Sequence, residues 1–162
     1  MIVGPEEFIA SVKEELRRPS FGNIAVVSAG DIVDGKNSGI VIEFVGPGHS
    51  GSVDIADIPV IYAFDFIAGA GAVVVFPGDN HDWTRKPNLR LWAAEYMAGY
   101  CAFWNVDGYD WLHDELPSIR ENHTSDAALR TAAWLCARIA ANIAVGSDVK
   151  RFPRFYIVES GE

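Results

Sequence analysis

The stretch PVIYAFDFIAGAGAVVVFPG, residues 59–78, decides how the middle of this chain folds. Two apolar runs, 59–68 and 72–78, flank a Gly-Ala-Gly segment, and β-branched and aromatic residues are frequent in both runs. This pattern is typical of two strands joined by a tight connection, so the sequence predicts an antiparallel β-hairpin. The preceding Asp-Ile-Pro at 57–59 is also typical of a helix start, and a helix reaching Ala68 is the alternative for the first run.

Two further apolar runs precede this hairpin, NIAVVSAG at 23–30 and GIVIEFVG at 39–46. The polar connection 31–38 is shorter than the roughly dozen residues that a parallel crossover needs, so these two strands are predicted to be antiparallel neighbours. With strand direction alternating along the chain, 39–46 is also expected to run antiparallel to 59–68. The tail RFPRFYIVES at 151–160 is predicted to form a last strand.

Three segments carry helical signals, namely 4–19, 86–104 and 125–146. The first has acidic residues near its start, basic residues near its end and an amphipathic apolar stripe between them. Ser125 is a favourable N-cap for the third helix, and Gly146 is typical of its end. Both later helices carry alanines along one side, which predicts that these two faces pack closely against each other.

These elements predict a single α+β domain over residues 1–162, with a mainly antiparallel sheet of about five strands and helices packed on one face. A chain of 162 residues is long enough to bury one hydrophobic core. The hydrophobic fraction of 49% and the charged fraction of 22% are typical of globular proteins and exclude disordered and fibrous classes.

The formal net charge of −9 argues against binding to nucleic acid, because phosphate backbones attract Lys and Arg. The longest uncharged run, 66–78, is too short for a membrane span, and the N-terminal segment lacks the pattern of a signal peptide. A cytoplasmic location is therefore the expectation. Cys101 and Cys136 are too few for a disulfide framework and are expected to be buried thiols.

The predicted strand directions bring two polar loops, 47–57 and 78–83, to one rim of the sheet. Imidazole and carboxylate ligands suit divalent transition metals, so the rim is a candidate metal site. The metal ligands proposed there are His49, Asp79 and His81. His81 and Asp82 could instead form a general-base pair for hydrolysis, with a small molecule bound between the loops. The structural alternative is that these residues only form turns after the apolar run.

Trp134 is a candidate interface residue, because it lies opposite the apolar stripe of the helix 125–146. Arg130 and Arg138 flank it at four residues on either side, so a cation–π contact is expected. Trp and Arg are enriched in binding hot spots, and this surface is predicted to mediate homo-oligomerisation. Packing against another part of the same chain is the alternative. Trp104, Tyr109 and Trp111 also suit a protein-binding surface or a pocket wall.

Two functions follow from the sequence. The first is a protein that binds a small molecule or divalent metal at the rim, with hydrolysis as its possible reaction. The second is an acidic protein-interaction module without catalytic activity, which occupies a basic partner as an inhibitor or an immunity-type factor does.

Overall fold

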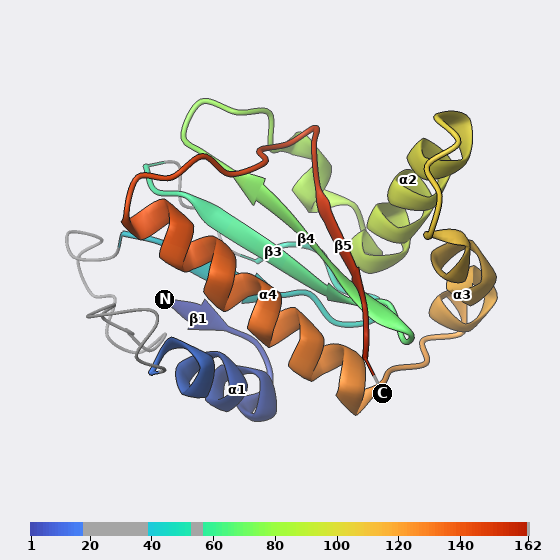
Figure 1. Ribbon diagram of the computed structural model, residues 1–162, viewed down its shortest axis with the longest axis horizontal. Coiled ribbons are helices and arrows are strands. Elements are labelled where there is room, and N and C mark those ends of the chain that lie inside the picture. The colour runs from blue at the N-terminus through green and yellow to red at the C-terminus, as the bar shows by residue number, and fades with distance from the viewer. Residues whose placement is uncertain (18–38, 53–56, 162) are drawn as a thin grey trace.

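The computed structural model describes residues 1–17, 39–52 and 57–161 (Figure 1). The predicted strand 23–30 lies outside the described residues. In chain order the elements are β1 (Ile2–Val3), α1 (Glu6–Leu16), β2 (Val41–Phe44), β3 (Val60–Asp65), β4 (Gly69–Val75), the 3₁₀-helix η3 (Asp82–Arg85), α2 (Leu89–Phe103), α3 (Asp110–Arg120), α4 (Asp126–Ala144) and β5 (Tyr156–Glu159).

The sheet has five strands in the order β1-β2-β3-β4-β5, and it is mixed rather than mainly antiparallel. Strands β1, β2 and β3 run parallel to one another, whereas β4 is antiparallel to both β3 and β5. The hairpin predicted within residues 59–78 is confirmed, with Val60 opposite Val75 and Asp65 opposite Ala70. The first of its runs is a strand and not a helix.

The parallel pairing of β2 with β3 contradicts the prediction that 39–46 runs antiparallel to 59–68. Val41 lies opposite Val60, and Phe44 lies opposite Ala63. The physical reason is the length of the connection, because residues 45–59 provide the roughly dozen residues that a parallel crossover needs. The same length criterion that favours a hairpin for a short connection therefore permits a crossover here.

Helices cover both faces of the sheet, which contradicts the prediction that they pack on one face. Helices α1 and α4 cover one face, while η3, α2 and α3 lie on the other (Figure 1). Along β3, Ile61 and Ala63 belong to the core under α1 and α4, whereas Tyr62 and Phe64 belong to the core under α2. Strands buried on both faces are apolar at every position rather than at alternate ones. Within the described residues, no helix is both long and apolar enough to cross a bilayer.

The alanine-rich faces of α2 and α4 do not meet, so the prediction that they pack together is wrong. Alanines of α4 share a core with small residues of the sheet, including Ala63, Ala70 and Ala72. Alanines of α2 lie in the other core, on the opposite face of the sheet. The small side chains instead allow α4 to lie close to the sheet, where van der Waals contact is dense.

A buried ion pair joins the end of β3 to the start of α2. Arg90 is 1% exposed, and its Nη2 lies 3.8 Å from Oδ1 of Asp65. Its Nε donates to the Asp65 carbonyl at 2.6 Å, and its Nη2 donates to the carbonyl of His123. The Asp65 carboxylate also accepts from the N–H groups of Ile67 at 2.7 Å and Ser125 at 2.8 Å. Ser125 is the N-cap of α4, so one carboxylate connects β3, α2 and α4.

Opposing influences act on the ionisation of this pair. Burial raises the pKa of Asp65 above its usual value, although the N–H groups of Ser125 and Ile67 and the charge of Arg90 lower it. Burial also lowers the pKa of Arg90. The desolvation cost of the two charges therefore makes the cluster dependent on keeping every partner in place.

We expect Asp65→Ala to lower the free energy of unfolding by about 3–5 kcal/mol, because Arg90 is left buried without its charge partner. The matched control is Arg120→Ala, which removes an exposed ion pair with Glu95 at 3.2 Å. That change is expected to cost less than about 1 kcal/mol. Urea denaturation followed by circular dichroism measures both values. Equal losses in the two variants would contradict the role given to Asp65.

Two glycines are expected to respond to alanine in opposite directions. A Cβ at Gly69 would lie 2.3 Å from the Val158 carbonyl oxygen and 2.4 Å from the Trp111 indole, so Gly69→Ala forces β5 and the indole apart. Its expected cost is about 1–3 kcal/mol of unfolding free energy. Gly99 lies in α2 with no atom within 4 Å of such a Cβ, and Gly99→Ala should stabilise by about 0.5–1 kcal/mol. Thermal denaturation compares the two variants, and a gain for Gly69→Ala would refute the close approach.

Candidate functional site

The segment after β2 crosses to the start of α2 and is held there by main-chain hydrogen bonds. The N–H of Gly51 donates to the Thr84 carbonyl at 2.7 Å, and the N–H of Leu89 donates to the His49 carbonyl at 3.0 Å. The Thr84 N–H in turn donates to the His81 carbonyl at 3.1 Å. The described part of the loop 47–57 therefore lies against residues 84–89, which follow the loop 78–83. Residues 53–56 of that loop lie outside the described residues.

Asp79 is committed to an ion pair with Arg151. The guanidinium donates from Nε to Oδ2 at 2.9 Å and from Nη2 to Oδ1 at 2.6 Å, and Oδ2 also accepts from the Phe76 N–H at 3.0 Å. The hydrogen bond from Arg151 is the main cause that holds the pKa of Asp79 below its usual value. Asp79 thus closes the turn after β4 and anchors the segment that leads into β5. No local sequence pattern indicates this partner, which lies 72 residues away.

The neighbouring polar residues form a turn among themselves. Nδ1 of the exposed His81 lies 3.1 Å from the Asp79 carbonyl oxygen, and the Asp82 N–H donates to Oδ1 of Asn80 at 3.1 Å. The Trp83 indole N–H donates to the Asn80 carbonyl at 3.0 Å. These contacts match the structural alternative, in which Asp and Asn bond back to their own chain.

The proposed metal ligands are only partly brought together. Asp79 and His81 share one turn, while His49 is exposed and is connected through its main chain to Leu89. Within the described ranges, no group of three or more His, Cys, Asp or Glu side chains is placed to hold a metal ion. The metal set His49, Asp79 and His81, and the catalytic pair His81 and Asp82, stay predictions.

Trp134 is half-buried on α4, and Arg138 covers its ring. The guanidinium carbon of Arg138 lies 5.1 Å from the ring centroid, which confirms the predicted cation–π contact for this arginine. Trp134 also lines a shallow groove with Arg130 and Thr131 of α4 and with Glu159 at the end of β5. The candidate interface residues therefore lie beside the outermost strand of the sheet.

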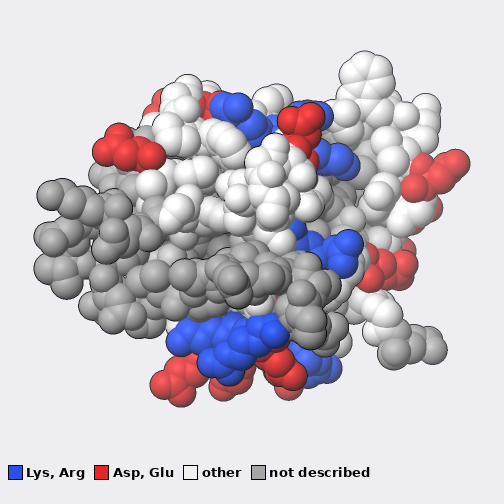
Figure 2. Space-filling model, turned by 60° about the vertical axis from the view of Figure 1, so that its left-hand side comes forward, with Lys and Arg blue, Asp and Glu red and all other residues white. Residues whose placement is uncertain are grey.

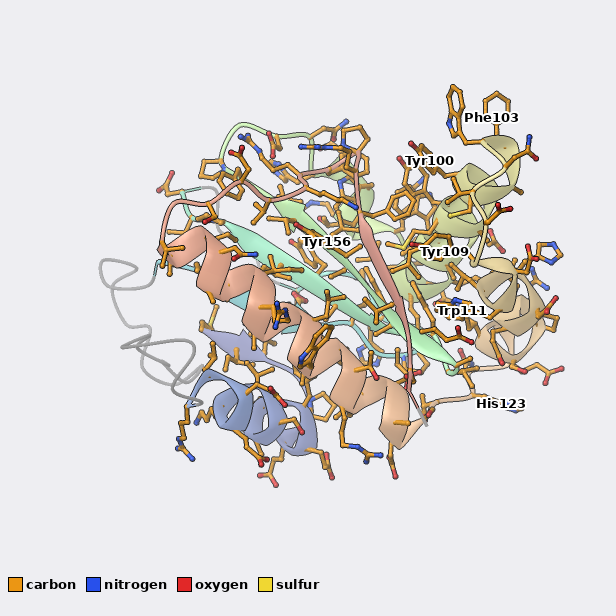
Figure 3. All side chains as sticks on the ribbon, viewed as in Figure 1. Tyr100, Phe103, Tyr109, Trp111, His123 and Tyr156 are labelled. Atoms are coloured by element: carbon orange, nitrogen blue, oxygen red, sulfur yellow. The ribbon has the colours of Figure 1, made fainter. Side chains whose placement is uncertain are left out.

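Four exposed apolar side chains gather where α2 ends. Phe103 is 77% exposed and Trp104 is 62% exposed, and Tyr100 and Val106 beside them are 46% and 39% exposed. The rings of Phe103 and Trp104 meet edge to face with centroids 5.0 Å apart. Figure 3 shows Phe103 pointing away from the body of the molecule at the end of α2. We call Tyr100, Phe103, Trp104 and Val106 the aromatic tip.

A continuous series of ring contacts connects the aromatic tip to the buried core. The Tyr100 ring meets Phe155 edge to face at 5.2 Å, and Phe155 in turn meets Tyr96 at 5.8 Å. Tyr96 stacks on Trp92 at 5.3 Å, and Trp92 stacks on the buried Trp83 at 5.5 Å. The Tyr96 hydroxyl also donates to the carbonyl of Pro153 at 2.8 Å. These contacts fix the position of the aromatic tip relative to the sheet.

A hollow of about 230 Å³ lies between the aromatic tip and β5. Its lining includes Tyr100, Val106 and Tyr109 on the helical side, Ile157 on β5, and the basic residues Lys150 and Arg154. We call it the tyrosine hollow. Trp104 and Tyr109 are the residues of this region that the sequence indicates as a protein-binding surface or pocket wall. Tyr100 and Phe103 instead continue the apolar stripe of the helical segment 86–104, a pattern that predicts burial. Trp111 is half-buried against Gly69 and belongs to the core beside the tyrosine hollow.

The Asp79–Arg151 pair predicts a pH-dependent contribution to stability. Because the folded-state pKa of Asp79 is depressed, its stabilising effect is present above the unfolded-state pKa of about 3.9 and is lost as pH falls through the folded-state value. Wild type should therefore be more stable than Asp79→Asn near pH 7, and the difference should shrink as the pH falls through the folded-state pKa of Asp79. Urea denaturation from pH 7 into the acid range measures this difference.

The control for this experiment is Asp82→Asn, which removes an exposed carboxylate that has no ion pair within the described residues. Near pH 7, the unfolding free energy of Asp82→Asn should be closer to that of wild type than the unfolding free energy of Asp79→Asn is. A difference between wild type and Asp79→Asn that stays constant from pH 7 to acid would contradict the proposed ion-pair effect.

The chain was compared with protein families, with curated proteins and with solved structures. No family model, no curated protein and no solved structure matches it. The function of this chain is therefore inferred from the chemistry and placement of its own residues.

Proposed function

We propose that this chain is an acidic protein-interaction module whose main binding surface is the aromatic tip. The observation that carries this proposal is the exposure of Phe103 and Trp104, at 77% and 62%, beside two further exposed apolar residues. Single exposed apolar residues are ordinary on protein surfaces, but a contiguous aromatic cluster is typical of an interaction site. Aromatic side chains are also enriched at the centres of protein interfaces.

The aromatic tip is held in place before any partner binds. Tyr100 packs on Phe155, and Trp104 lies 6.3 Å from the ring of Tyr100. The chain turns sharply after α2, where the Val106 N–H donates to the Cys101 carbonyl at 2.9 Å. A surface that is already ordered loses little conformational entropy on binding, which favours affinity.

Charge favours a partner with a basic surface. Acidic residues outnumber basic ones by 22 to 13 in the whole chain. The segment that follows the aromatic tip exposes Asp107, Asp110 and Asp114. Figure 2 shows acidic side chains protruding at the right-hand edge of the molecule. Complementary charge accelerates association and selects among partners, as expected for an inhibitor or immunity-type factor that covers a basic site.

The alternative function at the rim has weaker support. Asp79 is engaged with Arg151, and the contacts of His81 and Asp82 are those of a turn. Binding of a small molecule or divalent metal by His49, Asp79 and His81 would require these partners to separate first. We therefore favour the aromatic tip, where the exposed side chains need no rearrangement.

Site-specific photocrosslinking tests the proposed function. A benzoylphenylalanine introduced at position 103 should crosslink a discrete protein partner in the native host. The same group at position 145 is the matched control, because Val145 is 75% exposed at the end of α4 but lies outside the aromatic tip. The crosslinked protein is then purified and titrated against the full chain by calorimetry.

Trp104→Ala is expected to weaken this complex at least tenfold, corresponding to roughly 1.4 kcal/mol or more. Raising the salt concentration should slow association, because surface charges are screened. Val145→Ala should leave affinity within about twofold. Absence of a partner specific to position 103, or a complex insensitive to Trp104→Ala, would refute the proposal.

A further inference from the structure

We propose that β5 accepts an extended segment of the partner protein as an additional strand of the sheet. The inference rests on the proposed function in one respect, namely that the ligand is a protein. It concerns the main chain of β5, an edge strand of the sheet, rather than the exposed rings of the aromatic tip at the end of α2. Tyr100 and Val106 belong to the aromatic tip and also line the tyrosine hollow beside β5.

The pairing register shows which main-chain groups of β5 are turned outward. Val158 lies opposite Ala70, and the Ser160 N–H donates to the Ala68 carbonyl at 2.8 Å. Hydrogen-bonded positions alternate along an antiparallel pair, so the N–H and C=O groups of Ile157 and Glu159 point away from β4. Within the described part of the chain, nothing hydrogen-bonds to these outward groups. They form a short template for strand pairing.

The helices beside β5 extend past the edge of the sheet. Figure 1 shows α2 and α3 lying beyond β5, on the side away from β4. The tyrosine hollow lies between Tyr100 of α2, Val106 and Tyr109 of the connection to α3, and Ile157 of β5. Figure 3 shows Tyr100 and Tyr109 on this helical side of β5. On this face, the helices already form the layer against which one more strand could pack.

The shallow groove beside Trp134 lies on the opposite face of β5. Arg130, Thr131 and Trp134 of α4 form it together with Val158 and Glu159. Side chains of an added strand point alternately to the two faces of the sheet. One set would enter the tyrosine hollow and the other would lie along the groove beside Trp134. Main-chain pairing with pockets for alternate side chains is the recognition mode known as β-augmentation.

The occupant is assigned to a different protein rather than to a second copy of this chain. Two copies paired through antiparallel β5 strands would be related by a two-fold axis perpendicular to the sheet. Both pairs of α2 and α3 helices would then lie on the same face and extend across the shared edge. The overhang seen in Figure 1 makes these helices collide. A single extended segment has no such obstacle.

The lining of the tyrosine hollow and of the groove beside Trp134 defines the chemistry of the segment. Tyr100, Val106, Tyr109 and Ile157 favour apolar or aromatic side chains on the helical face. Arg130 and Thr131 on the α4 face favour polar side chains. We therefore expect an extended segment in which apolar and polar residues alternate.

A displayed library of random dodecapeptides, screened against the purified full chain, supplies the probe. Selected peptides should show apolar residues at alternate positions. Glu159→Pro removes an outward N–H without touching the hydrogen bonds to β4, whereas Glu159→Ala removes the same side chain and keeps this N–H. The comparison of the two variants therefore isolates the contribution of the N–H. Fluorescence polarisation should show at least about tenfold weaker binding to Glu159→Pro than to Glu159→Ala.

N-methylation of the peptide gives a second readout that does not depend on folding of the variant. Methyl groups on the peptide amides that face β5 should abolish binding, whereas methyl groups on alternate amides should not. Strand addition would be overturned if no peptides are selected, or if the N-methylated series shows no alternation. It would also be overturned if Glu159→Pro retains its circular dichroism spectrum and binds the peptides as wild type does.

The crosslinked partner separates this inference from the proposed function. Loss of partner binding in Glu159→Pro supports strand addition. A partner that is lost on Trp104→Ala but binds Glu159→Pro normally overturns strand addition while leaving the aromatic tip as a binding surface. If peptides bind β5 but no protein is crosslinked at position 103, the proposed function of the aromatic tip is refuted and strand addition at β5 is supported. A wild-type dimer in sedimentation that dissociates in Glu159→Pro would overturn the choice of occupant.

Discussion

The carboxylate of Asp65, buried against Arg90, is the constraint on which the arrangement of this molecule depends. It lies at the end of β3, yet its oxygen atoms hold the first N–H of the turn into β4 and the N-cap of α4. Arg90 adds the start of α2 and the main chain at His123, just before that cap. Helices on opposite faces of the sheet are thus positioned by one charged cluster. Because both charges are desolvated, this position is held only while all the partners remain together.

Local sequence patterns predicted much of the secondary structure but not the directions of the strands. Residues 60–65 and 69–75 form the expected hairpin, and the helix expected at 125–146 is present as α4. Strand direction depends on the route of the connection, and the length of 45–59 is compatible with more than one route. The apolar run 72–76 did indicate that helices cover both faces of the sheet, because apolar and polar residues do not alternate in it.

The contacts and exposure of the candidate site residues depend on distant parts of the chain, which local sequence patterns do not show. Asp79 and His81 look like ligands because they are polar and adjacent, but the partner of Asp79 lies in the tail at Arg151. Conversely, Phe103 continues an apolar helical stripe and therefore looks like a core residue. It is exposed because α2 extends past the sheet before it ends, so the sheet does not cover this side chain (Figure 1). Exposure of this kind depends on the length of one element relative to another.

The ring series from the core to the aromatic tip has an optical consequence. Trp83 and Trp92 stack with their planes 17° apart, and indoles this close exchange excitation and emit from a water-poor environment. Trp104 is surrounded by solvent and emits at longer wavelength. Among the five tryptophans of the chain, the stacked pair Trp83 and Trp92 therefore reports on the interior, and Trp104 reports on any molecule that binds at the aromatic tip.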